Sequence, residues 1–267
     1  MPEKLQVLLI FETLADIIFI MGSVHIEIVA EKVFSVFGFP VTNTLMMGWI
    51  TVFTLSLLAY ISYRKIGIVP GMVQNLFEVV VDKLLDAMSG VFETRIEAEK
   101  YFPVVATIFL FVLVSNWLGI LPGVGSIGLI EKIGEHEKLV PFFRSTASDL
   151  NFTLALALIS VFLTNIFGIT ALGIRKHTSK FINFKGPIDF FVGILELISE
   201  IAKMISFSFR LFGNVFAGEV LLVIIGFLVP FVIPMPFLLL EIFVGFIQAL
   251  VFAMLTIVFI SMAISHH

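Results

Sequence analysis

Residues 187–229 read PIDFFVGILELISEIAKMISFSFRLFGNVFAGEVLLVIIGFLV, and a second long apolar stretch follows at residues 237–264. A helix needs about 20 mostly apolar residues to cross a bilayer, so the first stretch is much longer than one perpendicular crossing requires. Pro230, Pro234 and Pro236 interrupt the apolar run between the two stretches. We therefore predict a hairpin of two long, strongly tilted membrane helices, and this hairpin decides the fold class.

The composition of the whole chain also indicates a membrane protein. Of its 267 residues, 59% are hydrophobic and 13% are charged, whereas an ordinary soluble domain has about 25% charged residues. A soluble fold this apolar could not cover its surface with polar groups, so we expect the excess to face a lipid bilayer. The net charge of −4 argues against a nucleic-acid partner, and the lack of cysteine excludes disulfides and cysteine-based metal sites.

Before the hairpin, the sequence predicts three shorter membrane spans and two helices on the membrane surface. The spans are residues 41–63, 102–121 and 150–173, and the surface helices are residues 5–20 and 72–94. Residues 72–94 place Asn75, Glu78 and Asp82 at helical spacing in an apolar run, which is typical of an in-plane amphipathic helix. A mixed-charge, Gly-rich loop is expected from residue 123 to 148. The predicted fold is thus an all-α integral membrane protein, with residues 1–267 forming one membrane domain.

The distribution of Lys and Arg predicts the orientation in the membrane. Arg64-Lys65 and the basic loop with Arg175, Lys176 and Lys180 fall on the same side if each intervening span crosses once. Basic loops favour the cytoplasm, so the N-terminus is expected outside and the C-terminus inside. No transit peptide is evident, and a bacterial plasma membrane is therefore the expected location.

Ionisable side chains lie within the apolar hairpin, where an Arg at the helix centre costs roughly 2.5–3.5 kcal/mol on insertion scales. On a helical wheel these side chains form one stripe about 80° wide. Its members are Glu196, Glu200, Lys203, Phe207, Arg210 and Asn214. Near the basic loop, Glu196 or Glu200 pairing with Lys203 at the membrane interface is the favoured interpretation of those three residues.

For Arg210, which lies deep in the apolar stretch, we favour a functional role. A structural ion pair between Arg210 and Glu219 or Glu241 is the alternative for Arg210. For Asn214 and Gln248, the spacing fits a functional role and a hydrogen bond between packed helices equally well. Glu241 and Gln248 are seven residues apart and therefore share one face of the last helix.

Motifs for catalysis or cofactor binding are missing from the sequence. His25, His136 and His177 are expected in loops or at interfaces, and no histidine has metal-ligand spacing within a span. No nucleophile–base pair or phosphate-binding Gly loop is evident. We therefore expect no catalytic residue, no cofactor and no metal.

Four motifs resemble subunit a of F-type ATP synthases. The run from Arg210 to Glu219, RLFGNVFAGE, is similar to the signature of that family. Residues 248–263 resemble its last helix, and residues 116–122 and 148–157 resemble the end of one span and the start of the next. The motifs occur in the family's order and cover most of the chain from about residue 40 onward.

This resemblance implies a function and a site. The family's essential arginine falls on Arg210, which would face a ring of c subunits and separate two aqueous half-channels. Asn214 and Gln248 match polar residues near that arginine, and Glu219 and Glu241 match positions of an access half-channel. The implied partners are the c-ring, the peripheral-stalk b subunits and the rest of the synthase. The subunit itself would be non-catalytic, coupling proton or sodium-ion flow to ring rotation and ATP synthesis.

Two departures from the family pattern concern the site. The family often has Arg-Pro where this chain has Lys203-Met204, and it often has one carboxylate and one histidine where this chain has Glu219 and Glu241. The coupling ion therefore stays open between H⁺ and Na⁺. A stand-alone ion channel or secondary transporter, and a structural membrane scaffold, are the alternative functions.

Overall fold

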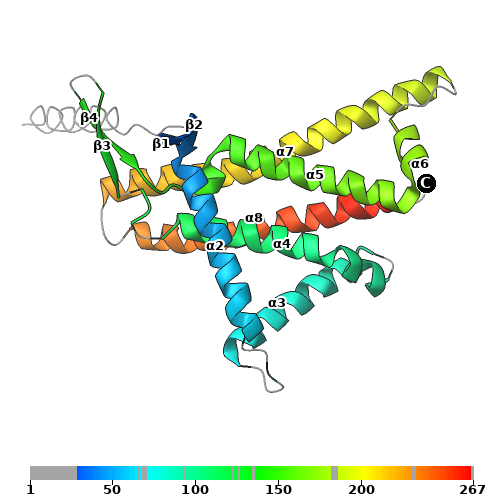
Figure 1. Ribbon diagram of the computed structural model, residues 1–267, viewed down its shortest axis with the longest axis horizontal. Helices are drawn as coiled ribbons and strands as arrows, with labels where there is room; N and C mark the ends of the chain where they lie inside the picture. The colour runs from blue at the N-terminus through cyan, green and yellow to red at the C-terminus, as the bar shows by residue number, and fades with distance from the viewer. Residues whose placement is uncertain are drawn as a thin grey trace, which may run out of the picture.

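The computed structural model describes residues 29–64, 67, 71–92, 94–121, 123–125, 127–133, 136–181, 186–229 and 233–265 (Figure 1). Within them, five helices are long and apolar enough to cross a membrane: α2 (Asn43–Arg64), α4 (Arg95–Gly119), α5 (Leu150–Leu172), α7 (Pro187–Leu228) and α8 (Pro234–Ile264). The predicted fold class, a helical membrane protein, is confirmed. The helix predicted at residues 5–20 and the predicted break at Pro230 lie outside the described residues.

Helix α8 lies at the centre of the arrangement and packs against α4, α5 and α7 (Figure 1). Small residues on α8 allow this close packing, because Ala249 and Ala253 are completely buried. Thr256 on α8 also shares a hydrogen bond of 3.0 Å with Ser160 on α5. Helix α2 crosses this group steeply in Figure 1, and α3 (Met72–Ser89) leads from the end of α2 back to α4.

The amphipathic helix α3 covers the start of α4. Its buried side chains Leu84 and Met88 join the core with Tyr101 of α4, while Glu78 and Asp82 are exposed. The helix ends at Ser89, five residues earlier than the predicted residue 94, and Gly90 follows.

Helix α4 begins at Arg95, seven residues before the predicted start at residue 102. Thr94 caps the helix by accepting a hydrogen bond of 3.3 Å from the Glu97 backbone N–H, and Arg95 pairs with Glu99 one turn later. Pro103 therefore lies inside the helix instead of at its entry. The start was predicted too late because Pro103 was taken to mark the entry to the span, and Thr94 was assigned to the end of the preceding amphipathic helix.

Two short β-hairpins, which the sequence analysis did not predict, accompany the helices. Strands β1 (Lys32–Val36) and β2 (Phe39–Thr42) pair antiparallel before α2. Strands β3 (Gly128–Ile133) and β4 (His136–Pro141) pair antiparallel where the sequence predicts only a loop, and the short helix η1 (Thr146–Ser148) follows them. The paired strands satisfy each other's backbone hydrogen bonds, which a loop without regular structure would leave to water.

Helix α7 is the least covered of the membrane-capable helices. Only 11% of its most apolar 18-residue window is buried, compared with 39% for α4. Its buried residues Phe207, Leu211 and Val215 face the rest of the chain, whereas Ile201, Phe209 and much of the remaining apolar surface are exposed. Helix α7 therefore presents a long apolar face to lipid or to another protein.

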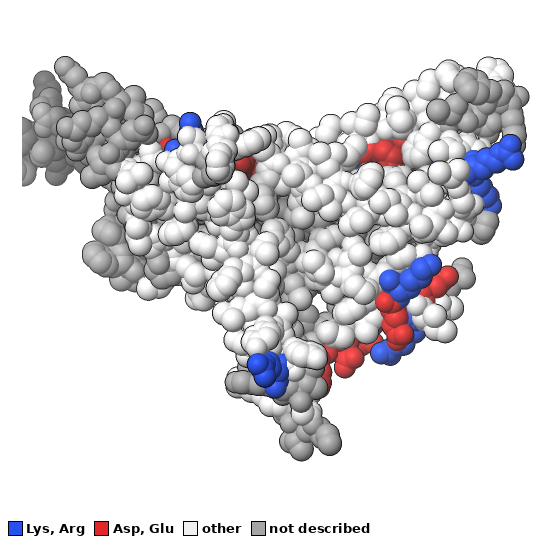
Figure 2. All heavy atoms as spheres, viewed as in Figure 1, with Lys and Arg blue, Asp and Glu red and all other residues white. Residues whose placement is uncertain are grey.

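Charged side chains gather at the margins of the molecule. Figure 2 shows a broad, mostly uncharged face over α2, α4 and α5, interrupted by an acidic patch between α5 and α7, with Lys and Arg at the end of α2, at the link between α3 and α4, and near α6 (Ile174–Ser179). An uncharged band between charged margins is the surface expected of a protein that crosses a bilayer.

Candidate functional site

Arg210 lies near the middle of α7 on its exposed side. One guanidinium nitrogen contacts Ser206 Oγ at 3.4 Å, and Asn214 donates a hydrogen bond of 2.9 Å to the Arg210 carbonyl oxygen. Phe207 and Leu211 are buried, so the helix turns Arg210 away from the interior of the chain. Within the part of the chain that the structure describes, no carboxylate forms an ion pair with Arg210, and the alternative pairing with Glu219 or Glu241 is therefore wrong.

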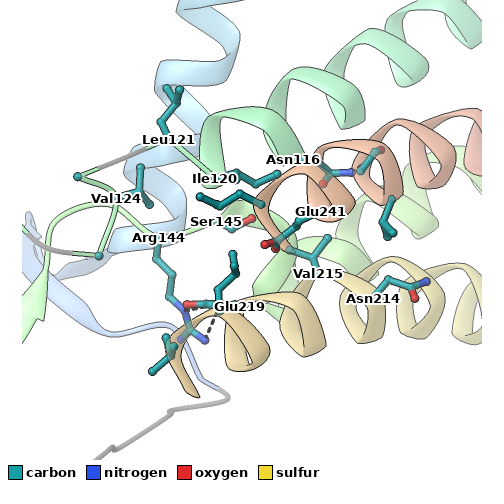
Figure 3. Close-up of a pocket in the computed structure, with 18 of the residues that line it drawn as sticks. Asn116, Ile120, Leu121, Val124, Arg144, Ser145, Asn214, Val215, Glu219 and Glu241 are labelled. Carbon is teal, nitrogen blue, oxygen red and sulfur yellow. Dashed lines mark hydrogen bonds and ion pairs between the residues drawn. The ribbon is translucent and has the colours of Figure 1, made fainter. Parts of the chain in front are cut away.

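A cavity of about 350 Å³ lies between the segment that joins α4 to α5 and the two long helices (Figure 3). Asn214 and Glu219 of α7 and Glu241 of α8 line it, together with Asn116 of α4 and Arg144 of the loop before α5. The cavity begins one helical turn from Arg210, because Asn214 follows that residue by four positions. The structure thus brings three of the five predicted site residues to one space.

Glu219 forms an ion pair that the sequence analysis missed. The Arg144 Nε atom lies 3.0 Å from Glu219 Oε1 and 3.4 Å from Oε2, and the Arg144 side chain is only 8% exposed. The sequence analysis counted Arg144 only as one charge of a mixed loop. Its position next to the apolar pair Phe142-Phe143, five residues before the N-cap Asp149, was the available signal that it lies deeper than the loop.

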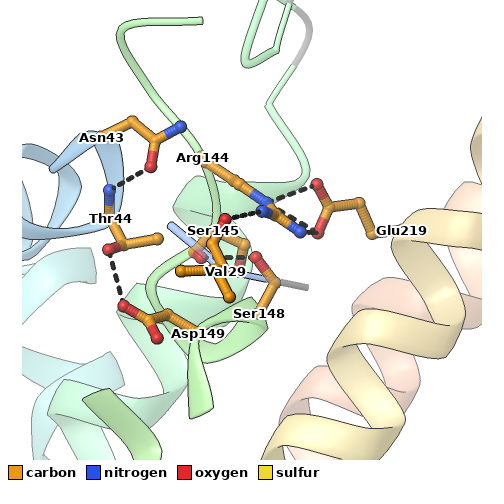
Figure 4. Close-up of polar contacts among 8 residues, drawn as sticks. All are labelled: Val29, Asn43, Thr44, Arg144, Ser145, Ser148, Asp149 and Glu219. Atoms are coloured by element: carbon orange, nitrogen blue, oxygen red, sulfur yellow. Dashed lines mark hydrogen bonds and ion pairs between the residues drawn. The ribbon is translucent and has the colours of Figure 1, made fainter. Parts of the chain in front are cut away.

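A network of short contacts holds the backbone around Arg144 in place (Figure 4). Asp149 caps α5 by accepting from the Asn151 N–H at 2.9 Å and also accepts from the Thr44 hydroxyl of α2 at 3.1 Å. Ser148 Oγ donates to the Ser145 carbonyl at 2.8 Å. The Arg144 side chain is therefore carried by a segment that is fixed to both α2 and α5.

Glu241 has a different environment from Glu219. Its Oε2 atom is buried without a hydrogen-bond partner, and no described cation forms an ion pair with it. Close helix packing surrounds it: the Asn116 amide donates to the Gly245 carbonyl at 3.1 Å, and the Trp117 indole donates to the Ile242 carbonyl at 3.1 Å. The two carboxylates therefore share a cavity but not a set of partners.

Gln248 and Arg210 do not line this cavity. Gln248 is half-buried on α8, two turns beyond Glu241. Gln248 therefore lies further along α8 than Glu241 does, away from the segment between α4 and α5 that lines the cavity.

The charged residues toward the N-terminal end of α7 form ion pairs within the chain. Lys203 Nζ lies 2.7 Å from Glu200 Oε1, as the spacing predicted, and 5.0 Å from the centre of the Phe259 ring. Glu196 pairs with Lys180 at 3.1 Å instead of with Lys203. These contacts agree with the structural interpretation of the three residues.

His177, which the sequence analysis expected in a loop or at an interface, is buried in the short helix α6. The Asn165 amide donates to the Val161 carbonyl at 2.9 Å and to Glu200 Oε2 at 3.4 Å, so its oxygen accepts from His177 Nε2 at 3.0 Å. Burial, and then the charge of Lys180, lower the pKa of His177 below its usual 6.5, although Glu200 opposes this. The neutral imidazole with its proton on Nε2 is the form that fits these contacts.

Among the described residues, no three His, Cys, Asp or Glu side chains are grouped so that they could hold a metal ion. The site is therefore a set of single charges and amides beside a cavity. Such groups can bind and release a small ion, but they do not form a catalytic triad or a metal centre.

Comparisons with known proteins point to one family. The sequence model of the family described as "ATP synthase A chain" matches residues 45–261. The chain is 36% identical over 224 residues to "ATP synthase subunit a" of Syntrophobacter fumaroxidans, covering 82% of each chain. It is 34% identical over 242 residues to the protein of that name from Helicobacter pylori strain P12, covering 88% of this chain and 96% of the relative. It is 35% identical over 235 residues to the Mycobacterium ulcerans protein, covering 85% and 90%.

Proposed function

Because the chain belongs to the family of ATP synthase subunit a, the ion-translocating membrane subunit of the F-type ATP synthase, we propose that Arg210 is the charge that couples ion passage to ring rotation. The observation that carries this proposal is the guanidinium on the exposed face of α7, which forms no ion pair with any described residue and lies one turn from a cavity with two carboxylates.

An unpaired charge at membrane depth is costly, so Arg210 needs a partner outside this chain. The exposed apolar face of α7 is a suitable binding surface for a ring of c subunits. A ring carboxylate that faces lipid must be neutral, because a bare charge there is expensive. Next to Arg210 the ionised form becomes favourable, and the carboxylate releases its ion.

The cavity serves as one of two access paths. Asn214, Glu219 and Glu241 give water and ions a polar route from the outer loops toward Arg210. The second path opens on the other side of the arginine. Because Arg210 separates the paths, an ion crosses only by travelling with the ring, and the membrane potential then sets the direction of rotation.

The remaining assignments follow from the family and the charge distribution. The chain is a multi-pass membrane component of the synthase, and its partners are the c-ring and the peripheral-stalk b subunits. We place it in a bacterial plasma membrane, with Arg64 at the end of α2 and Arg175 in α6 on the cytoplasmic side and the β3–β4 hairpin outside. This puts the N-terminus outside and the C-terminus inside. The subunit is non-catalytic, since ATP chemistry belongs to other parts of the complex.

Reconstitution tests this function. Liposomes that contain the complete membrane sector should conduct ions, while liposomes with this chain alone should not. Conduction by the chain alone would support a stand-alone channel or transporter instead. A scaffold would be indicated if neutralising Arg210 lowered flux only in proportion to lost assembly.

A further inference from the structure

The two carboxylates of the cavity differ in one respect that matters for ion transfer. Glu219 contacts the Arg144 guanidinium through both of its oxygens, whereas Glu241 has a buried oxygen without any partner. Figure 3 shows Arg144 reaching from the loop to Glu219, while Glu241 from α8 points into the same space. A group that carries an ion must be free to lose one partner and gain another, and only Glu241 is in that situation.

Arg144 is built into the fold and is not a flexible surface side chain. Its side chain is 8% exposed, compared with 31% for Glu219. A second guanidinium nitrogen approaches the Val29 carbonyl at 3.5 Å, and the Asp149 contacts to α2 and α5 hold the nearby backbone (Figure 4). A cation held this way stays in place while ions pass, since an Arg remains charged when partly buried.

Two carboxylates in one cavity repel each other when both are ionised. The guanidinium of Arg144 compensates one of these charges and binds it in a planar contact that matches the carboxylate. The cavity then contains one compensated and one uncompensated carboxylate, which gives the two glutamates different tasks.

We propose that Arg144 is a positioning residue of the access path: it fixes Glu219 in an ion pair and leaves Glu241 as the carboxylate that exchanges the transported ion with water. This inference rests on the function proposed above for Arg210 and its access paths. For a proton, the step is a transfer from a hydronium ion in the cavity to the Glu241 carboxylate, followed by transfer onward toward the ring. One O–H bond of the hydronium ion breaks to leave water, and one O–H bond forms on Glu241.

The test uses the assembled synthase in inverted membrane vesicles, with ATP-driven ion pumping and ATP synthesis as the activities. Arg144→Gln should lower coupled pumping at least about tenfold, because it leaves Glu219 as an unpaired partly buried charge. The double variant Arg144→Gln/Glu219→Gln restores charge balance and should recover most of the activity. Arg144→Gln/Glu241→Gln should stay inactive, because the ion-carrying group is missing. Arg95→Gln, which removes an exposed and surface-paired arginine, is the matched control.

A second measurement separates positioning from a merely structural role. The cavity faces the lumen of inverted vesicles, and the lumenal pH that gives half-maximal synthesis should shift by at least about half a unit in Arg144→Gln, because two adjacent carboxylates then titrate together. In the double variant Arg144→Gln/Glu219→Gln, the pH of half-maximal synthesis should return to the wild-type value. If the amount of assembled complex falls while this pH stays unchanged, Arg144 is structural and the inference is wrong.

The outcomes also distinguish this inference from the proposed function. Equal recovery by removing Glu241 instead of Glu219 would overturn the assignment of roles while leaving Arg210 untouched. Normal ATP synthesis in an assembled Arg210→Ala complex would instead overturn the proposed function itself.

Discussion

The carboxylate of Glu241 on α8 lies directly against Gly218 on α7. A Cβ atom added at Gly218 would lie 2.6 Å from Glu241 Oε1 and 3.0 Å from Cδ. The two long helices therefore meet at a point where one has no side chain and the other has an ionisable group. The residue next to Gly218 is Glu219, and both carboxylates line the same cavity.

Gly218→Ala should disturb the position of Glu241 more than the stability of the fold. The atoms that must move belong to the flexible end of the Glu241 side chain, so assembly should be nearly normal. Coupled ion pumping should fall roughly tenfold, because small displacements of a transfer group reduce its rate strongly. Gly226→Ala is the control, since nothing lies within 4 Å of its added Cβ atom. Equal effects of both substitutions would contradict this account.

Arg210→Lys should be largely inactive in coupled transport, although it preserves the charge. Lysine lacks the planar, delocalised head that meets a carboxylate with two hydrogen bonds. Arg210→Ala should abolish ATP synthesis and retain or raise passive ion flux, because the barrier between the two access paths is lost. The measurement pairs synthesis with passive flux in vesicles stripped of the catalytic head. Near wild-type synthesis by a fully assembled Ala variant would show that the role given to Arg210 is wrong.

Glu219→Gln and Glu241→Gln should each slow ion transport and leave assembly largely intact. The first leaves Arg144 without its carboxylate, and the second removes the unpaired carboxylate of the cavity. Their combination should reduce transport further than either one alone. Proton-pumping rates per assembled complex provide the comparison, and unchanged coupled transport in the double variant would mean that the cavity is not on the ion path.

Cysteines introduced at the exposed positions Glu78 and Asp82 of α3 should react with a membrane-impermeant reagent from the cytoplasmic side. A cysteine at the buried Leu84 is the control and should react slowly. The reason is that an amphipathic helix lies with its polar face toward water. Labelling of the two ends of α3 from opposite sides of the membrane would instead make this helix a true span.

His177 should make the stability of the complex sensitive to acid. Its pKa in the folded protein is below the usual 6.5, so the folded state binds a proton less readily than the unfolded state does. Stability should not depend on this group above pH 6.5, and should fall as the pH decreases from 6.5 toward the lowered pKa. Thermal inactivation midpoints across this range provide the measurement. His177→Asn should remove this contribution, and a slope equal to that of the wild type would exclude His177 as its source.

Element types and their approximate positions could be read from the sequence because membrane helices have a strong local signal. Helix α5 begins at Leu150, as expected, since Asp149 is a capping residue directly before an apolar run. Helix α8 begins at Pro234, three residues before the predicted residue 237, because proline is accepted in the first turn of a helix. The β3–β4 hairpin was missed because its strands are short and their stability comes from pairing with each other.

The sequence by itself determined that this chain is a membrane protein, where its long apolar helices lie, and that Arg210 is a charge within a long apolar stretch. These properties depend on composition and on the order of residues along one helix. Only the tertiary structure decided which charges meet. Arg144 and Glu219 are far apart in sequence but 3.0 Å apart in space, and Arg210 has no carboxylate partner among the described residues. Ion pairing acts over a few ångströms, so it depends on how α7, α8 and the loop before α5 pack together, and helical spacing within one segment does not contain that information.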